Sequence, residues 1–250
     1  MKRKNLTYSL ILSCLLSQAA NAGWDGSFLV GMSGGWAERD GQVNATITHP
    51  LPGFPTTTFI NGGDSNFDNG YLWGLLAGYE ITNSTWIIGL EANLDWQDKR
   101  HKNDDNILAF TDNINQGWMY TPHFKTNGVL AFTGRLGYQL FTYLIPYVRL
   151  GPEFSSNRFR FFAYDPVQGL FAEGDSKQHM VRAVLGAGAQ VPIPFIMTGL
   201  SLRGEYNYHS RGKSIDSEGL ARPDYATLWN ANTKVSTNSF KASIVWNLPI

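Results

Sequence analysis

The chain has 250 residues, in which 20 Lys and Arg residues balance 20 Asp and Glu residues, and it contains 26 glycines and 14% aromatic residues. This neutrality argues against a nucleic-acid-binding protein, because such proteins gain affinity from an excess of Lys and Arg that neutralises phosphates. Mean hydropathy is −0.21, and no apolar run after the N-terminus approaches the roughly 18 residues of a membrane-spanning helix. A helical membrane protein is therefore excluded, which leaves a secreted β protein or a membrane β-barrel.

The first 22 residues are typical of a secretory signal peptide. Residues 2–4 are basic, an apolar stretch follows, and Ala20-Asn21-Ala22 supplies the small residues at a cleavage site. We expect residues 1–22 to be removed and residues 23–250 to form the mature domain. Cleavage would also remove Cys14, the single cysteine, and three basic residues but no acidic ones, which leaves a net charge of −3 and no disulfide.

Eight segments alternate between apolar and polar residues with a period of two, the pattern of a β-strand with two different faces. Most are about ten residues long or more, which is the length of a tilted strand that crosses a bilayer. The segments cover residues 24–36, 71–81, 86–97, 127–140, 146–154, 181–191, 200–209 and 240–250.

Aromatic residues bracket the apolar face of these segments at both ends. Membrane barrels show this arrangement because the rings anchor at the two membrane interfaces. The predicted aromatic girdles consist of Trp24, Tyr79, Trp86, Tyr138 and Trp246 toward one end and of Trp36, Trp73, Trp96 and Tyr208 toward the other.

The connections alternate between short and long, as periplasmic turns and extracellular loops do in membrane barrels. Short turns are predicted at residues 82–85, 141–143 and 192–197, and long polar loops at residues 38–69, 98–124, 155–178 and 210–235. The loops carry aromatic residues that we expect to be exposed for recognition, with packing of the loops against one another as the alternative. They include Phe54, Phe59, Phe67, Phe110, Trp118, Phe159, Phe161, Phe162 and Trp229. Together these patterns predict an all-β, eight-stranded antiparallel up-and-down transmembrane β-barrel, with a secreted sandwich as the alternative.

Four short stretches of the segments share a family likeness. Residues 134–138 (Gly-Arg-Leu-Gly-Tyr) and 146–149 (Pro-Tyr-Val-Arg) flank a predicted turn, and residues 88–92 and 202–206 lie in the third and seventh segments. They resemble the small outer-membrane β-barrel family, which includes the opacity proteins and the OmpA-like transmembrane domain. The resemblance implies export to the cell outer membrane, contact with its lipid and lipopolysaccharide, and insertion by the barrel-assembly machinery. Such barrels usually end in an aromatic residue, whereas this chain ends in Leu248-Pro249-Ile250.

Charged residues occupy the polar face of the segments and are expected to point into the barrel. An eight-stranded barrel has an interior that side chains fill, so opposite charges should pair there, Glu91 with Arg135 and Glu153 with Arg182. The narrow interior favours a static polar plug over a gated pore. The predicted lumen network consists of Glu91, Arg135, Arg149, Glu153, Arg182, Arg203, Glu205 and Lys241.

We predict no catalytic, metal or cofactor site. Residues 64–68 (Asp-Ser-Asn-Phe-Asp) resemble part of a calcium loop, but Asn69 follows where such a loop needs glycine and Leu75 where it needs an acid. Barrel enzymes that act on lipid A use a His, a Ser and an acid near the outer rim. Strand parity sends His209 into the lumen and Ser210 outward, so these two should not share a proton.

Three functions therefore stay open: surface interaction or envelope structure, a narrow channel, and a lipid A-modifying enzyme. Long loops on a rigid scaffold are usually functional, which favours the first. We expect a surface antigen or interaction protein that is not an enzyme, has no cofactor, binds no nucleic acid, and holds an extracellular or host ligand through its four loops.

Overall fold

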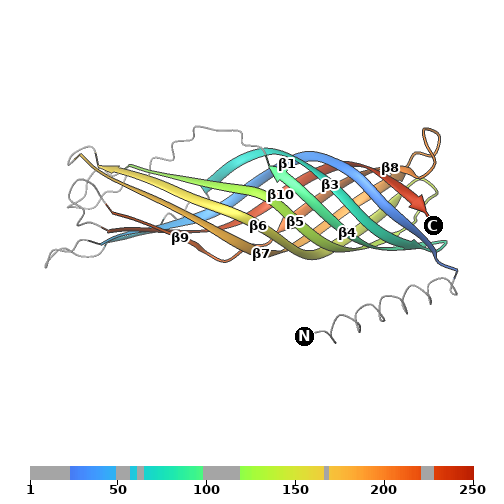
Figure 1. The fold of residues 1–250 in the computed structure, drawn as a ribbon, viewed down its shortest axis with the longest axis horizontal. Helices are drawn as coiled ribbons and strands as arrows, with labels where there is room; N and C mark the ends of the chain where they lie inside the picture. The colour runs from blue at the N-terminus through green and yellow to red at the C-terminus, as the bar shows by residue number, and fades with distance from the viewer. Residues whose placement is uncertain (1–22, 49–56, 61–64, 98–118, 166–168, 221–227) are drawn as a thin grey trace, which may run out of the picture.

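Antiparallel strands, most of them long, form most of the described part of the protein (Figure 1). The computed structural model describes residues 23–48, 57–60, 65–97, 119–165, 169–220 and 228–250. No helix in these ranges is long and apolar enough to cross a membrane. The strands are β1 (Asp25–Thr48), β2 (Thr57–Ile60), β3 (Ser65–Thr82), β4 (Trp86–Gln97), β5 (Met119–Tyr138), β6 (Ile145–Asp165), β7 (Leu170–Pro192), β8 (Leu200–His209), β9 (Ile215–Leu220) and β10 (Leu228–Pro249).

Eight of the strands close into a barrel. In the order β1, β3, β4, β5, β6, β7, β8 and β10 each pairs with the next, and β10 pairs with β1. The two short strands lengthen the wall: β2 pairs with β1 beyond the end of β3, and β9 pairs with β10 beyond the end of β8. Closure removes the free edges that hydrocarbon would not tolerate. The predicted all-β, eight-stranded antiparallel barrel is confirmed.

Short turns join the strands at one end of the barrel, as predicted. Between β3 and β4, the Asn83 side-chain oxygen accepts hydrogen bonds from the backbone N–H groups of Thr85 (2.8 Å) and Trp86 (2.6 Å). Between β7 and β8, Gly199 has a φ of +81°, and a Cβ there would lie 2.3 Å from the backbone oxygen of Asn247. The Asn83 hydrogen bonds stabilise the first of these turns, and the positive φ and close approach at Gly199 require glycine in the turn between β7 and β8.

The prediction of long loops is wrong for most of the described residues in those ranges, because the strands continue far beyond the eight segments. Barrel strands or their extensions cover residues 38–48, 57–60, 65–69, 119–124, 155–165, 170–178, 215–220 and 228–235. We call this part of the wall, beyond the lipid-facing segments, the outer extension.

The alternation does not stop at the end of each segment; its polarity inverts. Along β6, Glu153 is buried and Phe154 is exposed, but six residues later Phe159 is buried and Arg160 is exposed. Within a membrane the outward side chains meet lipid and must be apolar, whereas in water the apolar side chains are driven inside. A search for apolar residues on the outward face therefore ends at Phe154 although the strand continues.

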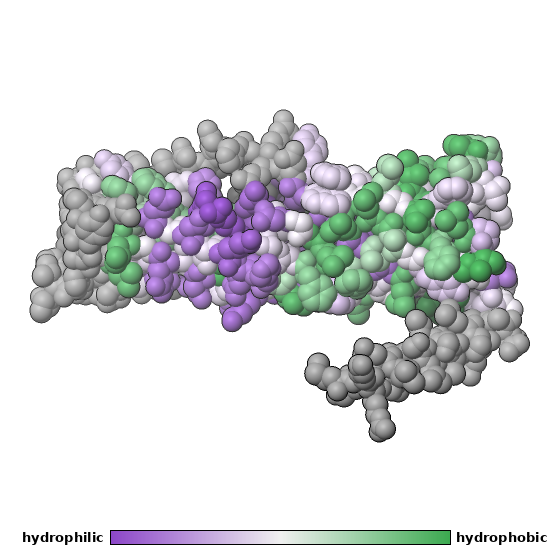
Figure 2. Space-filling view, in the orientation of Figure 1, coloured by the Kyte–Doolittle hydropathy of each residue, from purple (hydrophilic) through white to green (hydrophobic). Residues whose placement is uncertain are grey.

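The outside of the barrel accordingly has two zones. Figure 2 shows a hydrophobic zone on the half that carries the short turns and a hydrophilic zone beside it. The hydrophobic zone, which we call the lipid-facing belt, includes the exposed residues Phe28, Met32, Leu75, Leu90, Phe132, Leu136, Val148, Leu150, Leu185, Leu202, Phe240 and Ile244.

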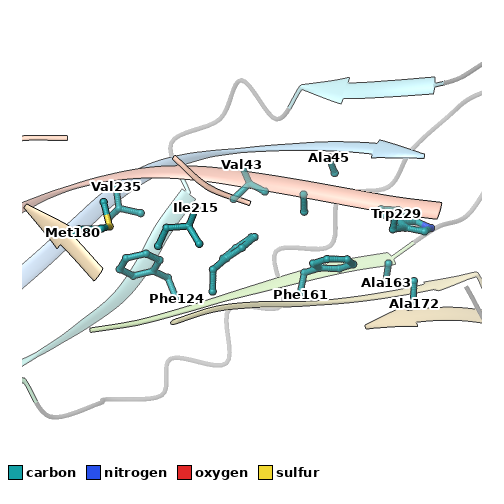
Figure 3. Packing of buried hydrophobic residues seen from close by; sticks show 12 residues of the cluster. Val43, Ala45, Phe124, Phe161, Ala163, Ala172, Met180, Ile215, Trp229 and Val235 are labelled. Carbon is teal, nitrogen blue, oxygen red and sulfur yellow. The ribbon is translucent and has the colours of Figure 1, made fainter. Parts of the chain in front are cut away.

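An apolar core fills the outer extension, and its side chains converge from several strands in Figure 3. We call it the apolar plug: Val43, Ala45, Phe124, Phe159, Phe161, Ala163, Ala172, Met180, Ile215, Trp229, Ala231 and Val235. The expected exposure of Phe159, Phe161 and Trp229 is therefore wrong, since all three are buried here, while Phe162 is exposed. The other expected loop aromatics, Phe54, Phe59, Phe67, Phe110 and Trp118, lie outside the residues whose side chains are described.

Candidate functional site: the polar lumen

All eight residues of the predicted lumen network point into the barrel, from β4, β5, β6, β7, β8 and β10. None is more than 5% exposed. The structure adds three further buried charges, Arg39 on β1, Glu80 on β3 and Asp95 on β4. The alternation of the segments already placed Glu80 and Asp95 on the polar face, and the same pattern was therefore enough to predict both residues as members of the lumen network. Arg39 was missed because it fell in a predicted loop.

Arg135 joins two carboxylates at the end of the lumen near the short turns. One of its Nη atoms contacts Glu80, its Nε lies 3.3 Å from a Glu91 oxygen, and its other Nη donates to Gln190 at 2.7 Å. The predicted pair of Glu91 with Arg135 is present. Arg203 lies closer to Glu91, at 2.6 Å, and also lies 3.9 Å from Glu80. Two carboxylates and two guanidinium groups therefore compensate one another across the barrel.

Glu205 organises the next level. It accepts hydrogen bonds from Arg149 at 2.8 Å and from the Tyr147 hydroxyl at 3.0 Å. The Lys241 ammonium lies 3.8 Å from Glu205 and 2.9 Å from each oxygen of Asp95. These contacts join β4, β6, β8 and β10 across the lumen. Sequence parity places each side chain inside but does not tell which partner across the barrel it meets.

Glu153 lies at the boundary with the outer extension and contacts two cation-forming side chains. Arg182 donates to it from Nε at 3.1 Å, which is the predicted Glu153–Arg182 pair. His209 contacts the other carboxylate oxygen through Nδ1, and its Nε2 lies 3.1 Å from the Ser239 hydroxyl. Ser210 lies apart from this group, since its hydroxyl accepts a hydrogen bond from the backbone N–H of Ala183.

The chain of carboxylate, imidazole and hydroxyl formed by Glu153, His209 and Ser239 has the order of a hydrolytic triad. The cavity that these residues line has a volume of about 20 Å³, which is room for roughly one water molecule. An acyl substrate does not fit beside Ser239, and Arg182 shares the carboxylate. Across the described ranges, no group of three or more His, Cys, Asp or Glu side chains could hold a metal ion.

The predicted girdle aromatics lie on the outer wall, and none of the nine is buried. Neighbouring rings pack across strands: Trp73 stacks on Trp96 at 4.4 Å between centroids, and Trp86 packs edge-on against Tyr138 at 5.0 Å. Half-buried members are Trp24, Trp36, Tyr79 and Trp96, and exposed members are Trp73, Trp86, Tyr138, Tyr208 and Trp246.

Comparison with known proteins relates the chain to outer-membrane barrels. One similar solved structure is Ail, the attachment invasion locus protein of Yersinia pestis, with 15% sequence identity, a TM-score of 0.38, and coverage of 87% of this chain and 98% of that one. Another is the outer membrane protease OmpT from Escherichia coli, with 9% sequence identity, a TM-score of 0.46, and coverage of 89% of this chain and 97% of that one. OprG from Pseudomonas aeruginosa is also similar, with 12% sequence identity, a TM-score of 0.37, and coverage of 90% of this chain and 96% of that one. None of the curated proteins compared with this chain matches it. The sequence profile of the outer membrane protein beta-barrel domain matches residues 8–247, so this chain belongs to that family and is a β-barrel protein of the outer membrane.

Proposed function

We propose that this barrel is a surface-interaction protein whose contact surface lies at the far end of the outer extension. The observation that carries the proposal is a group of apolar side chains exposed on the outside of this otherwise polar wall. We call the group the distal patch; it consists of Phe162 and Tyr164 on β6, Phe171 on β7, Leu220 on β9 and Leu228 on β10.

The strands bring the distal patch together. The rings of Phe162 and Phe171 stack at 6.4 Å between centroids, and Leu220 lies directly opposite Leu228. β9 runs close beside β7, since a Cβ on Gly219 would lie 2.4 Å from a backbone oxygen of β7. Lipid does not account for this exposure, because polar residues separate the patch from the lipid-facing belt. Exposed apolar patches rimmed by polar residues mark interaction sites, and aromatic residues supply much of the binding energy there.

The interior of the barrel supports an interaction role over transport or catalysis. The lumen is crossed by buried ion pairs, and the apolar plug fills the extension above them. The cavity beside His209 and Ser239 has room for about one water molecule. These features favour a rigid scaffold that presents its outer surface, so we propose no enzymatic activity and no conducting pore.

The proposal includes export and partners. A basic start and an Ala-Asn-Ala cleavage motif support export through a signal peptide at residues 1–22. The barrel-assembly machinery would insert the chain beside lipopolysaccharide, and the ligand of the distal patch would be an extracellular or host protein. Surface exposure of the extension would also make the protein an antigen.

The test uses whole cells that display the full-length protein. Phe162→Ser combined with Phe171→Ser removes the stacked pair, and Asn230→Ser combined with Asn232→Ser is the control on the same extension. Adhesion to cultured epithelial cells is measured alongside surface display. Because an aromatic hot spot contributes about 2 kcal/mol or more, the aromatic variant should lose at least about 30-fold in affinity for the cell surface, while display is unchanged and the control adheres normally.

Two other outcomes would overturn the proposal. If the aromatic variant adheres as well as the wild type and purified protein gives a stable conductance in planar bilayers, the barrel is a channel. If lipid A extracted from expressing cells changes in mass and Ser239→Ala abolishes the change, the barrel is a lipid A-modifying enzyme.

A further inference from the structure

Two acidic side chains lie beside the distal patch on the outside of the barrel. On β7, Glu173 follows Phe171 by two residues and is the register partner of Phe162 on β6. On β9, Glu218 precedes Leu220 by two residues. Both acids are exposed, and because alternate residues of a strand share a face, each lies on the same outer face as its apolar neighbour. We call Glu173 and Glu218 the acidic rim.

The two acids of the rim project from strands that lie side by side. A Cβ on Gly174 would lie 2.7 Å from the Ser217 hydroxyl, and a Cβ on Gly219 would lie 2.4 Å from the backbone oxygen of Glu173. Glu218 lies between Ser217 and Gly219 in the chain, so the two carboxylates leave β7 and β9 at nearly the same height. Like charges beside one another on neighbouring strands are destabilising, and a cation from outside would relieve this repulsion.

The charge of the acidic rim is not compensated within the described part of the chain. There, neither Glu173 nor Glu218 forms an ion pair, and Glu218 only accepts a hydrogen bond of 3.4 Å from the Asn230 amide. The next outward residue of β7, Asp175, differs because it accepts hydrogen bonds from two arginines of β6, at 2.6 and 2.9 Å. The rim therefore keeps its negative charge available for a partner.

The exposed charge changes sign along the outer extension. Near the lipid-facing belt, cationic side chains such as Lys125 on β5 and Lys177 on β7 are exposed. Figure 2 shows a second hydrophobic area toward the far end, beyond the hydrophilic zone. The described far ends of β6, β7, β9 and β10 contain five acidic residues and no lysine or arginine, over residues 161–165, 169–176, 215–220 and 228–233. The distal patch thus lies in surroundings that are apolar and negatively charged.

We infer that the protein partner of the distal patch presents a cationic apolar segment, in which aromatic or aliphatic side chains alternate with Lys or Arg. The apolar side chains pack on the stacked rings of Phe162 and Phe171, and the cations meet Glu173 and Glu218. Exposed aromatic faces also attract cations. Complementary charges around an apolar centre steer association and repel partners of the wrong sign. This inference rests on the proposed function and adds the chemistry of the ligand.

The experiment measures the binding of labelled peptides to the purified full-length protein in phosphatidylcholine nanodiscs, by fluorescence anisotropy. The cationic apolar probe is Lys-Phe-Lys-Leu-Lys-Gly, and its two counterparts are the acidic Glu-Phe-Glu-Leu-Glu-Gly and the cationic polar Lys-Ser-Lys-Ser-Lys-Gly. Binding to empty nanodiscs is subtracted. The cationic apolar peptide should bind at least about tenfold more tightly than either counterpart, because only this peptide matches both the apolar centre and the charge of the rim.

The variants separate the rim from the patch. Glu173→Gln combined with Glu218→Gln removes the charge of the rim, and the control Glu38→Gln removes an exposed acid of β1 on the same extension. Since an exposed ion pair changes an affinity by about threefold, the rim variant should bind the cationic apolar peptide about tenfold more weakly, while the control binds as the wild type does. This loss should shrink to about twofold in 1 M NaCl, because salt screens exposed charges.

The inference and the proposed function fail in different ways. If either counterpart peptide binds as tightly as the cationic apolar one, or if the rim variant keeps full affinity at low salt, the partner is not a cationic apolar segment and the inference is refuted. Loss of cell adhesion by the variant that lacks Phe162 and Phe171 would still support the proposed function in that case. Normal adhesion by that variant would refute the proposed function itself, whatever the peptides show.

Discussion

The Arg135 side chain offers the sharpest test of the lumen network. Arg135→Ala removes one of two guanidinium groups that face Glu80 and Glu91. Arg203 then remains, 2.6 Å from Glu91 and 3.9 Å from Glu80, so the four-residue group keeps one uncompensated buried charge. Removing one partner of a buried pair typically costs about 3–5 kcal/mol. We expect Arg135→Ala to lower the unfolding free energy by about 4 kcal/mol. Arg203 still neutralises one of the two carboxylates, which reduces the cost, whereas the cavity left by the truncated side chain adds to it.

The measurement is urea unfolding in detergent micelles, followed by the fluorescence of the eight tryptophans. Leu136→Ala, the next residue on β5, changes a lipid-facing side chain that detergent replaces, and it should cost about 2 kcal/mol or less. Glu80→Gln should partly rescue Arg135→Ala, because it removes the carboxylate left with the weakest partner. A coupling of about 1 kcal/mol or more between the two changes is expected. If Arg135→Ala costs no more than Leu136→Ala, or if Glu80→Gln worsens it, the charge-balance argument is wrong.

Three further predictions concern the wall and the extension. Phe159→Ala opens a cavity in the apolar plug and should lower the unfolding free energy by about 3–5 kcal/mol, measured in the same assay. Gly151→Ala would place a Cβ 1.9 Å from a backbone oxygen of β5, whereas a Cβ at Gly134 would lie 3.9 Å from its nearest neighbour. Gly151→Ala should therefore lower the unfolding free energy by about 1–3 kcal/mol and Gly134→Ala should lower it little, as measured by the temperature at which the electrophoretic band shifts. The hydrogen bond from Arg158 holds the pKa of Asp175 below its usual value. The Asp175 carboxylate therefore stabilises the fold above about pH 4, and this stabilisation is lost as pH falls through the lowered pKa. The difference in unfolding free energy between wild type and Asp175→Asn should vanish in acid, and a difference that persists there would contradict the role of the ion pair.

The lipid-facing belt could be predicted from the sequence because lipid imposes a strict rule on every outward residue. Leu136 and Val148 had to be apolar, and their neighbours Arg135 and Arg149 had to find partners inside. The period of two therefore identified each wall strand, and the length of each connection indicated its place at the turn or loop end. The buried position of all eight predicted network residues follows from the same parity.

The tertiary structure alone decided how far the strands continue and which side chains meet. Beyond the belt the solvent on the outside changes from lipid to water, so the same alternation carries apolar residues inward; Phe159 and Trp229 resembled loop aromatics for this reason, yet they are buried in the plug. The contacts of Arg203 with Glu91 and of His209 with Glu153 and Ser239 join residues far apart in the chain. Local periodicity states only that a side chain points inward, whereas its partner depends on the stagger and closure of the barrel, which no single strand encodes.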